Sequence, residues 1–164
     1  MAFYPGAGLD IAPILLFPYI QRWYYMDTQP CVDLPFFIQR LGKIMKQIGF
    51  ECTRYHNTTL FFMETNGKRT VTYYTNSVFP DDMYKHEIQA STLVACGFSF
   101  PNAPSFFYRQ WKHVITDNKT EPSIIDKFVT ENLTTIMWDG EYVQEYKTPQ
   151  YIVEHTRLMF KVIN

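Results

Sequence analysis

The sequence predicts an α/β domain in which helices flank a mostly parallel sheet and antiparallel hairpins extend that sheet. Three observations predict this class. Strand-like and helix-like segments alternate along most of the chain, the uninterrupted apolar run 92–96 is typical of a buried central strand, and Asn66-Gly67 and Asp139-Gly140 are hairpin signals. The 164 residues contain no internal repeat and no linker rich in Gly or Ser, so we expect a single domain over residues 1–164.

The amino-terminal elements are predicted to be short. A strand at 2–4 runs into the bend Pro5-Gly6-Ala7-Gly8, where the glycines permit a sharp turn of the backbone. Asp10 can cap a short apolar helix that begins near Ile11 and ends at Pro18.

An aromatic strand and the clearest helix of the chain come next. The strand, 22–26, stops at Asp27. Residues 34–48 place apolar side chains at helical spacing on one side and basic or amide side chains on the other. Asp33 is expected to cap this helix, and Gly49 is the residue type expected just past its end.

The middle of the chain is predicted to return to strands. The segments 59–64 and 69–74 flank Asn66-Gly67, and both residues of this dipeptide tolerate the positive φ angles of a type I′ turn. A helix over about 79–89 then precedes the buried strand 92–96.

Two helices followed by strands complete the prediction. The helices are expected near 106–114 and near 122–131. Strands 134–138 and 141–145 flank the second hairpin signal, and 158–163 is a candidate for the last strand.

The amino-acid composition limits which core, binding partners and cellular compartment can be expected. The aromatic fraction of 18% predicts a core built on rings. The 15 Lys and Arg residues are balanced by 16 Asp and Glu residues, which excludes an extensive nucleic-acid surface but leaves room for a small local basic patch. Cys31, Cys52 and Cys96 form no CxxC pair and the histidines are scattered, so we expect a reducing, cytoplasmic setting and no metal site. No apolar run reaches the roughly 18 residues that a membrane helix needs.

A Gly-x-Gly bend after a first strand is a pattern found where nucleotides bind. Without side chains at Gly6 and Gly8, the backbone can turn sharply and approach a ligand closely. Asp27 follows Gly8 by 19 residues at the expected carboxyl end of the second strand, where a carboxylate can accept hydrogen bonds from a ribose diol. The plainer alternatives are that the glycines only make a tight turn, that Asp10 only caps a helix, and that Cys96 packs as a small apolar residue.

The stretch Phe3-Tyr4-Pro5-Gly6-Ala7-Gly8-Leu9-Asp10, followed by Trp23-Tyr24-Tyr25-Met26-Asp27, resembles the first two motifs of class I S-adenosylmethionine-dependent methyltransferases. It is also similar to uncharacterised Rossmann-like proteins of large DNA viruses, in which a Gly-Ala-Gly-x-Asp turn leads to a segment like Asp27-Thr28-Gln29-Pro30. The resemblance implies a Rossmann-like fold that binds S-adenosylmethionine or a related adenosine nucleotide, in the host cytoplasm or in a virion.

The resemblance also implies which residues meet the cofactor. Gly6 and Gly8 would lie beside its methionine part, Asp27 would bind its ribose, and the strand end Cys96-Gly97 would face the substrate. The implied cofactor site therefore consists of Gly6, Ala7, Gly8, Asp10, Asp27, Cys96 and Gly97. No residue is indicated as a catalytic base, so the pattern leaves open whether the chain is an enzyme.

Two alternatives stand beside the methyltransferase hypothesis. The family has an acid two residues before its first glycine, where this chain has Tyr4, and this departure favours a non-catalytic viral scaffold or interaction protein with a degenerate cofactor site. Such a protein would act through a protein partner. A nicotinamide-dependent enzyme is disfavoured because the Gly-x-Gly-x-x-Gly pattern breaks at Ile11.

Overall fold

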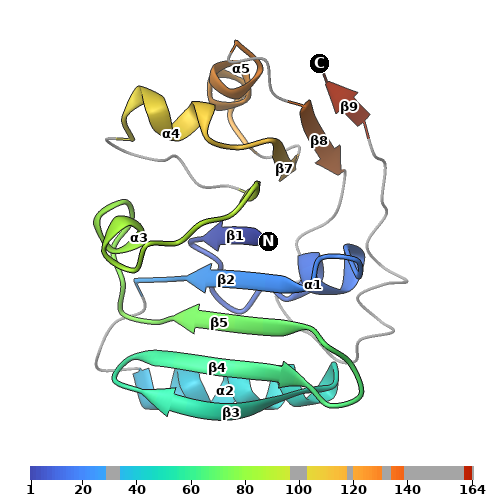
Figure 1. Cartoon of the computed structure of the whole chain (residues 1–164), viewed down its shortest axis with the longest axis vertical. Helices are drawn as coiled ribbons and strands as arrows, with labels where there is room; N and C mark the ends of the chain where they lie inside the picture. Colours follow the sequence, from blue (N-terminus) through green and yellow to red (C-terminus); the bar gives the residue numbers. More distant parts are fainter. Residues whose placement is uncertain (29–33, 97–102, 118–119, 131–133, 139–160, 164) are drawn as a thin grey trace.

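A computed structural model of the chain describes residues 1–28, 34–96, 103–117, 120–130, 134–138 and 161–163 (Figure 1). Its strands are β1 (Ala2–Pro5), β2 (Arg22–Met26), β3 (Phe50–His56), β4 (Thr59–Glu64), β5 (Thr70–Tyr74), β6 (Thr92–Ala95), β7 (His113–Asp117), β8 (Thr134–Trp138) and β9 (Lys161–Ile163). Its helices are α1 (Ala12–Leu16), α2 (Leu34–Gln47), α3 (Asp81–Lys85), α4 (Ser105–Arg109) and α5 (Pro122–Thr130).

These strands form one sheet in the order β3-β4-β5-β2-β1-β6-β7-β8-β9. Five of its neighbouring pairs are parallel, and three are antiparallel, namely β3 with β4, β4 with β5, and β8 with β9. The predicted α/β class, with a mostly parallel sheet and antiparallel additions, is therefore confirmed.

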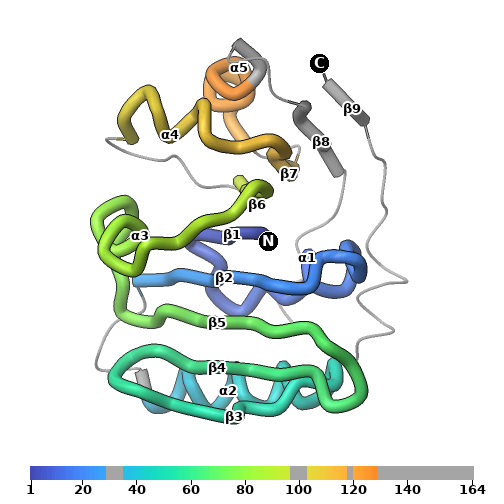
Figure 2. Tube along the Cα trace, viewed as in Figure 1, coloured from blue at the N-terminus to red at the C-terminus, as the bar shows by residue number. Residues whose placement is uncertain are grey.

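Helices cover both faces of this sheet. One apolar cluster packs α1 and α2 against one face, and a second cluster packs α3, α4 and α5 against the other. Along the chain trace, α2 runs beside β3 and β4, whereas α4 and α5 gather at the opposite end of the molecule near β7 (Figure 2). Both clusters are built on buried rings, as the composition predicted, and these include Trp23, Tyr25, Phe37, Phe3, Phe107 and Trp111.

The chain reverses the direction in which it adds strands at β1. First β2 and then β5 lie on one side of β1, whereas β6 and then β7 lie on its other side. The carboxyl ends of these parallel strands meet the same edge of the sheet, and ligands of open α/β sheets bind in the crevice at such a reversal. The fold therefore places the loops after β1, β2 and β6 where a ligand site is expected.

Local patterns predicted the amino-terminal elements closely. The bounds of β1, β2 and α2 lie within one residue of their predictions, and α1 ends before Pro18. Gly49 follows α2 with a φ of +88°, the left-handed conformation that suits glycine at this position. The predicted capping residue Asp33 lies outside the described residues.

The predicted hairpin of β4 and β5 is confirmed, but its predicted turn is wrong. Neither Asn66 nor Gly67 has a positive φ, so the turn is not type I′. The connection is longer than two residues, and the Glu64 N–H donates a hydrogen bond to the Arg69 carbonyl across it at 3.0 Å. A Cβ atom on Gly67 would lie 2.5 Å from a carboxylate oxygen of Glu64, so that carboxylate occupies the space that a side chain would need.

One strand, β3, was missed by the sequence analysis. It pairs antiparallel with β4 through a turn at Asn57, whose φ is +54°, and it forms an edge of the sheet. Every residue of β3 after Phe50 is exposed, so the apolar–polar alternation that marks a half-buried strand is absent. A β-bulge between Cys52 and Arg54 interrupts this edge and discourages pairing with another chain.

Two predicted helices are shorter than expected. The helix α3 ends early because Glu87 adopts a φ of +52°, which interrupts the helical backbone. The predicted helix 106–114 is wrong beyond Arg109, where α4 ends, because the chain then enters β7. The β-branched run Val114-Ile115-Thr116 favours a strand. This strand lies between β6 and β8, and all three side chains are buried.

The carboxyl-terminal elements follow the prediction where they are described. The helix α5 and the strand β8 confirm the predictions near 122–131 and at 134–138, and β9 confirms the end of the predicted strand 158–163. The second predicted hairpin, with its strand 141–145, lies outside the described residues.

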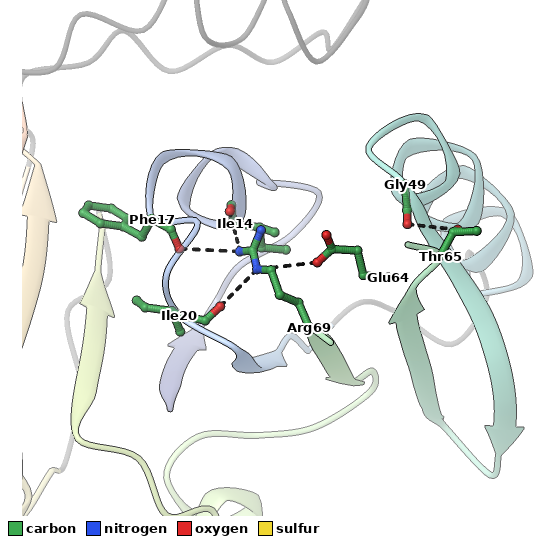
Figure 3. Close-up of polar contacts among 7 residues, drawn as sticks. All are labelled: Ile14, Phe17, Ile20, Gly49, Glu64, Thr65 and Arg69. Atoms are coloured by element: carbon green, nitrogen blue, oxygen red, sulfur yellow. Dashed lines mark hydrogen bonds and ion pairs between the residues drawn. The ribbon is translucent and has the colours of Figure 1, made fainter. Parts of the chain in front are cut away.

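Arg69, which directly precedes β5, connects the α1 layer to the sheet (Figure 3). Its guanidinium donates hydrogen bonds to the carbonyls of Ile14 at 2.6 Å, Ile20 at 3.1 Å and Phe17 at 3.5 Å. Its Nε atom also lies 3.9 Å from the Glu64 carboxylate. A helix of five residues satisfies few of its own carbonyls, so this half-buried cation provides donors that α1 lacks.

Replacing Arg69 with Met is expected to lower the free energy of unfolding by about 2–4 kcal/mol, because several carbonyls lose a charged donor at once. Arg69→Lys should recover only part of the loss, because one ammonium group cannot reach all three carbonyls. Urea unfolding would measure both effects against Lys68→Met, which removes the neighbouring exposed cation. Equal stability of the Arg69→Met and Lys68→Met variants would contradict this role.

Candidate functional site

The candidate site begins with the glycine bend between β1 and α1. Gly6 and Gly8 both adopt the left-handed conformation, with φ angles of +66° and +55°. The Ala7 N–H donates to the carbonyl of Met26 at 3.2 Å, and the Asp10 N–H donates to the Ala7 carbonyl at 3.0 Å. The two glycines therefore turn the backbone back over the end of β2.

Asp27 lies directly beside this bend. The Gly8 N–H donates a hydrogen bond to Oδ2 of Asp27 at 2.6 Å. The Asp27 backbone is held as well, since its N–H donates to the Tyr74 carbonyl at 3.1 Å and its carbonyl accepts from Ser77 N–H at 2.9 Å. The structure thus brings together the glycines and the carboxylate that the sequence analysis paired across 19 residues.

Tyrosine hydroxyls from two strands anchor the bend from within the core. Tyr73 in β5 donates to the carbonyl of Gly8 at 2.5 Å, and Tyr25 in β2 donates to the carbonyl of Asp10 at 2.8 Å. The two rings lie 5.5 Å apart, centre to centre. Sequence reasoning missed both residues, because the hydrogen bonds join positions that are 65 and 15 residues apart.

Asp10 is buried and its carboxylate holds the local structure. Its Oδ1 accepts the Ala12 N–H at 3.1 Å, which agrees with the predicted capping, although the helix-capping position itself is Ile11. Its Oδ2 accepts the Tyr4 hydroxyl at 2.7 Å. Burial, and then the Asp10 charge, raise the pKa of Tyr4 well above its usual value, so the phenol stays protonated as a donor.

Cys96 directly follows the strand β6 at the same edge of the sheet. Burial raises the pKa of its thiol well above the usual value, and the charges of Asp117 and Asp10 raise it further. A thiol in this state is a poor nucleophile, so the structure favours the packing role over a reactive one. Gly97, the other residue expected at this strand end, lies outside the described residues.

Asp117 at the end of β7 is a further acid at this edge, and the sequence analysis missed it. Its Oδ1 accepts the Thr120 N–H at 3.0 Å, and the Thr120 hydroxyl lies 2.8 Å from the carbonyl of Ala95 in β6. The Thr116 hydroxyl reaches the same carbonyl at 2.8 Å. An acid at a strand end was the available signal, but the sequence analysis predicted a helix up to residue 114 and no strand at this place.

The carboxyl edge of the sheet is therefore acidic, with Asp10 and Asp27 after β1 and β2, and Asp117 at the end of β7. Within the described residues, no group of three or more acidic, His or Cys side chains is arranged to hold a metal ion.

None of the helices in the described parts of the chain is long and apolar enough to cross a membrane. Comparison with protein-family models, curated proteins and solved structures finds no match to this chain.

Gly8→Ala is expected to lower the free energy of unfolding by about 1–2 kcal/mol, because an L-residue is strained in the left-handed conformation. The new Cβ would meet Asp27 Oδ2 at an ordinary 3.8 Å, so no steric clash adds to this cost. Gly42→Ala in α2 is the matched control, because its Cβ would meet nothing within 4 Å. The Gly42→Ala variant should be more stable than the parent chain by about 0.5–1 kcal/mol. If Gly8→Ala also stabilised the protein, the expected backbone strain at residue 8 would be contradicted.

The Cys96 thiol is expected to alkylate slowly, with a rate that still rises above pH 9, because its pKa is raised. Asp117→Asn should shift this profile to lower pH, since removing a nearby negative charge favours the thiolate. Iodoacetamide kinetics in a Cys31→Ser/Cys52→Ser background would measure the profile of this thiol alone. A rate that levels off below pH 8 would show an activated cysteine instead.

Proposed function

We propose that the chain is a Rossmann-like domain that binds S-adenosylmethionine or a related adenosine nucleotide at the glycine bend and Asp27. The observation that carries the proposal is the 2.6 Å hydrogen bond between Gly8 N–H and the Asp27 carboxylate, which joins the two halves of the motif. The strand order supports it as well. When β1, β2, β5, β6, β7 and β8 are numbered one to six, the parallel strands follow the order 3-2-1-4-5-6 of dinucleotide-binding folds.

The chemistry of the bend favours a nucleoside or a sulfonium over a pyrophosphate. The Gly8 N–H, which a phosphate would need, already donates to Asp27. A phosphate at this place would also approach the negative charges of Asp27 and Asp10, whereas the positive sulfonium of S-adenosylmethionine would be attracted to them. This argument also disfavours a nicotinamide dinucleotide.

Each residue of the site would have a distinct task. Asp27 would accept hydrogen bonds from the ribose hydroxyls, because a carboxylate can accept several hydrogen bonds beside the one from Gly8. The backbone of Gly6, Ala7 and Gly8 would face the methionine part, with no side chain to block its approach. Asp10 would hold the bend from inside the core and would not touch the ligand.

If the domain is catalytic, its contribution would be positional. S-adenosylmethionine, when bound, carries an electrophilic methyl group. The protein would hold this group in line with an acceptor near the Cys96 strand end, and such proximity can contribute much of the acceleration. No described side chain is assigned as a base in this proposal.

A non-catalytic interaction protein is the second candidate, and one observation favours it. Tyr4, which stands in place of the family's acid, is buried, and its hydroxyl is bound to Asp10. Exposed rings that could contact a protein are also present, with Tyr84 and Phe106 5.8 Å apart on α3 and α4. In that case the fold would persist without a working cofactor site.

Calorimetric titration of the whole chain with S-adenosylmethionine and S-adenosylhomocysteine would test the proposal. Asp27→Asn should weaken binding about 5- to 150-fold, equivalent to about 1–3 kcal/mol, because the ribose loses a charged acceptor. The amide oxygen can still accept the Gly8 N–H, so this variant keeps the bend. Asp81→Asn, an exposed acid in α3, is the matched control and should bind as the parent chain does.

The same titration separates the alternatives. ATP and NAD are expected to bind at least about tenfold more weakly than S-adenosylmethionine, because their phosphates would meet the acidic edge. Tighter binding of NAD would instead support a nicotinamide-dependent enzyme. Absence of binding at millimolar S-adenosylmethionine would refute the proposal and favour the interaction protein.

A further inference from the structure

Among the described residues, one face of the sheet lacks a covering helix at β3 and β4. The buried residues of β3, β4 and β5 all belong to the cluster that packs against α1 and α2. The cluster on the other face takes its buried sheet residues from β1, β6, β7 and the last residue of β2, and the partly buried Tyr24 in β2 and Tyr74 in β5 pack against it. In Figure 1, α2 lies behind β3 and β4, and no described helix lies in front of them.

The strand register places four side chains in one row across this open face. Arg54 in β3 pairs with Phe61 in β4, Phe61 pairs with Thr72 in β5, and Thr72 pairs with Tyr24 in β2. Residues opposite each other in neighbouring strands point to the same face, so the row alternates ring-bearing and polar side chains. Phe61 and Tyr24 are each partly exposed, and two strand spacings separate them by about 10 Å.

One arginine lies at each end of this row. The Arg54 guanidinium lies over the Phe61 ring, 5.5 Å from its centre. Arg22 is exposed at the start of β2, and the register places it opposite Thr70 on the same face as Tyr24. The register of β3 with β4 places two further titratable side chains on this face. These are Glu51 near the start of β3 and His56 at its end.

A groove adjoins the face at Arg22. It has a volume of about 500 Å³ and is lined by Met1, Tyr19, Ile20, Gln21, Arg22 and Thr92. Tyr19 is 72% exposed, so its ring offers a further flat apolar surface. The Tyr24 hydroxyl points to the sulfur of Met1 at 3.8 Å and so connects the row to this groove.

We propose that this open face binds a short stretch of single-stranded nucleic acid. Bases of a single strand stack on aromatic rings and on guanidinium planes, and a sheet face that carries both is a platform of this kind. The row alternates rings with cationic or hydroxyl groups, an arrangement that suits bases joined by a charged backbone. Arg22 and Arg54 would bind the phosphates.

The platform is small, and its size agrees with the composition. A formal net charge of −1 excludes a long electrostatic track but not a local patch with two arginines. With Phe61 and Tyr24 about 10 Å apart, the face has room for two stacked bases and not for a duplex, whose bases are already paired and stacked. This inference does not depend on the nucleotide site at the carboxyl edge of the sheet.

Fluorescence anisotropy with labelled ten-nucleotide oligo(dT) and oligo(U) would test the proposal on the whole chain. Phe61→Leu should weaken binding about tenfold through the loss of one stacked base. Arg54→Gln and Arg22→Gln should each reduce the slope of log Kd against log salt concentration by about 0.7. An unlabelled duplex of the same length should compete at least about tenfold less well than the single strand.

The helix α2 provides matched controls on the opposite side of the sheet. There, Arg40 lies 5.7 Å from the centre of the exposed Phe36 ring, so Phe36→Leu and Arg40→Gln remove the same pair of groups elsewhere. Both variants should bind as the parent chain does. Circular dichroism would show whether each variant is folded, and a misfolded Phe61→Leu would be replaced by Tyr24→Leu.

Four outcomes would overturn the proposal. These are no binding of either oligonucleotide at 100 μM protein, equal loss in the α2 controls, equal competition by the duplex, and a dimer in sedimentation that Phe61→Leu dissociates. The last result would assign the face to contact between two copies of the chain.

Discussion

The hydrogen bond from the Gly8 N–H to the Asp27 carboxylate is the contact on which the candidate site depends. It can form only because both glycines of the bend adopt left-handed φ angles and so turn the backbone over the end of β2. Two tyrosine hydroxyls from β2 and β5 then fix the carbonyls of Gly8 and Asp10. The bend is therefore held in place by the protein itself, which would limit the entropy cost of the proposed ligand binding.

The uneven distribution of helices explains why two separate surfaces are candidates for binding. Around β1, β6 and β7, helices cover both faces, so a ligand there can reach only the edge where the strands end. Around β3 and β4, the second face lacks a described helix, so its side chains are available to a partner. The antiparallel additions to the sheet thus create a surface that the parallel core does not offer.

Short-range patterns predicted the elements whose signals are local. The helix α2 has apolar residues at helical spacing, and β6 is an uninterrupted apolar run, so both elements can be predicted from a few neighbouring residues. The strand β3 was missed because its exposed position at the sheet edge removes the alternation that marks a strand. The strand β7 was missed, and its first two residues were assigned to the end of a helix, because its identity comes from pairing with β6 and β8 and not from an amphipathic period.

The sequence by itself determined the α/β class, the glycine bend and the pairing of that bend with Asp27, because each depends on residue types at fixed short distances or at strand ends. Only the tertiary structure decided that Tyr4 and Tyr25 meet Asp10, that Tyr73 meets Gly8, and that Arg54, Phe61 and Tyr24 share one face. These contacts join residues far apart in the chain, and strand order and register bring them together. No local pattern encodes either property, since both follow from how the whole sheet packs.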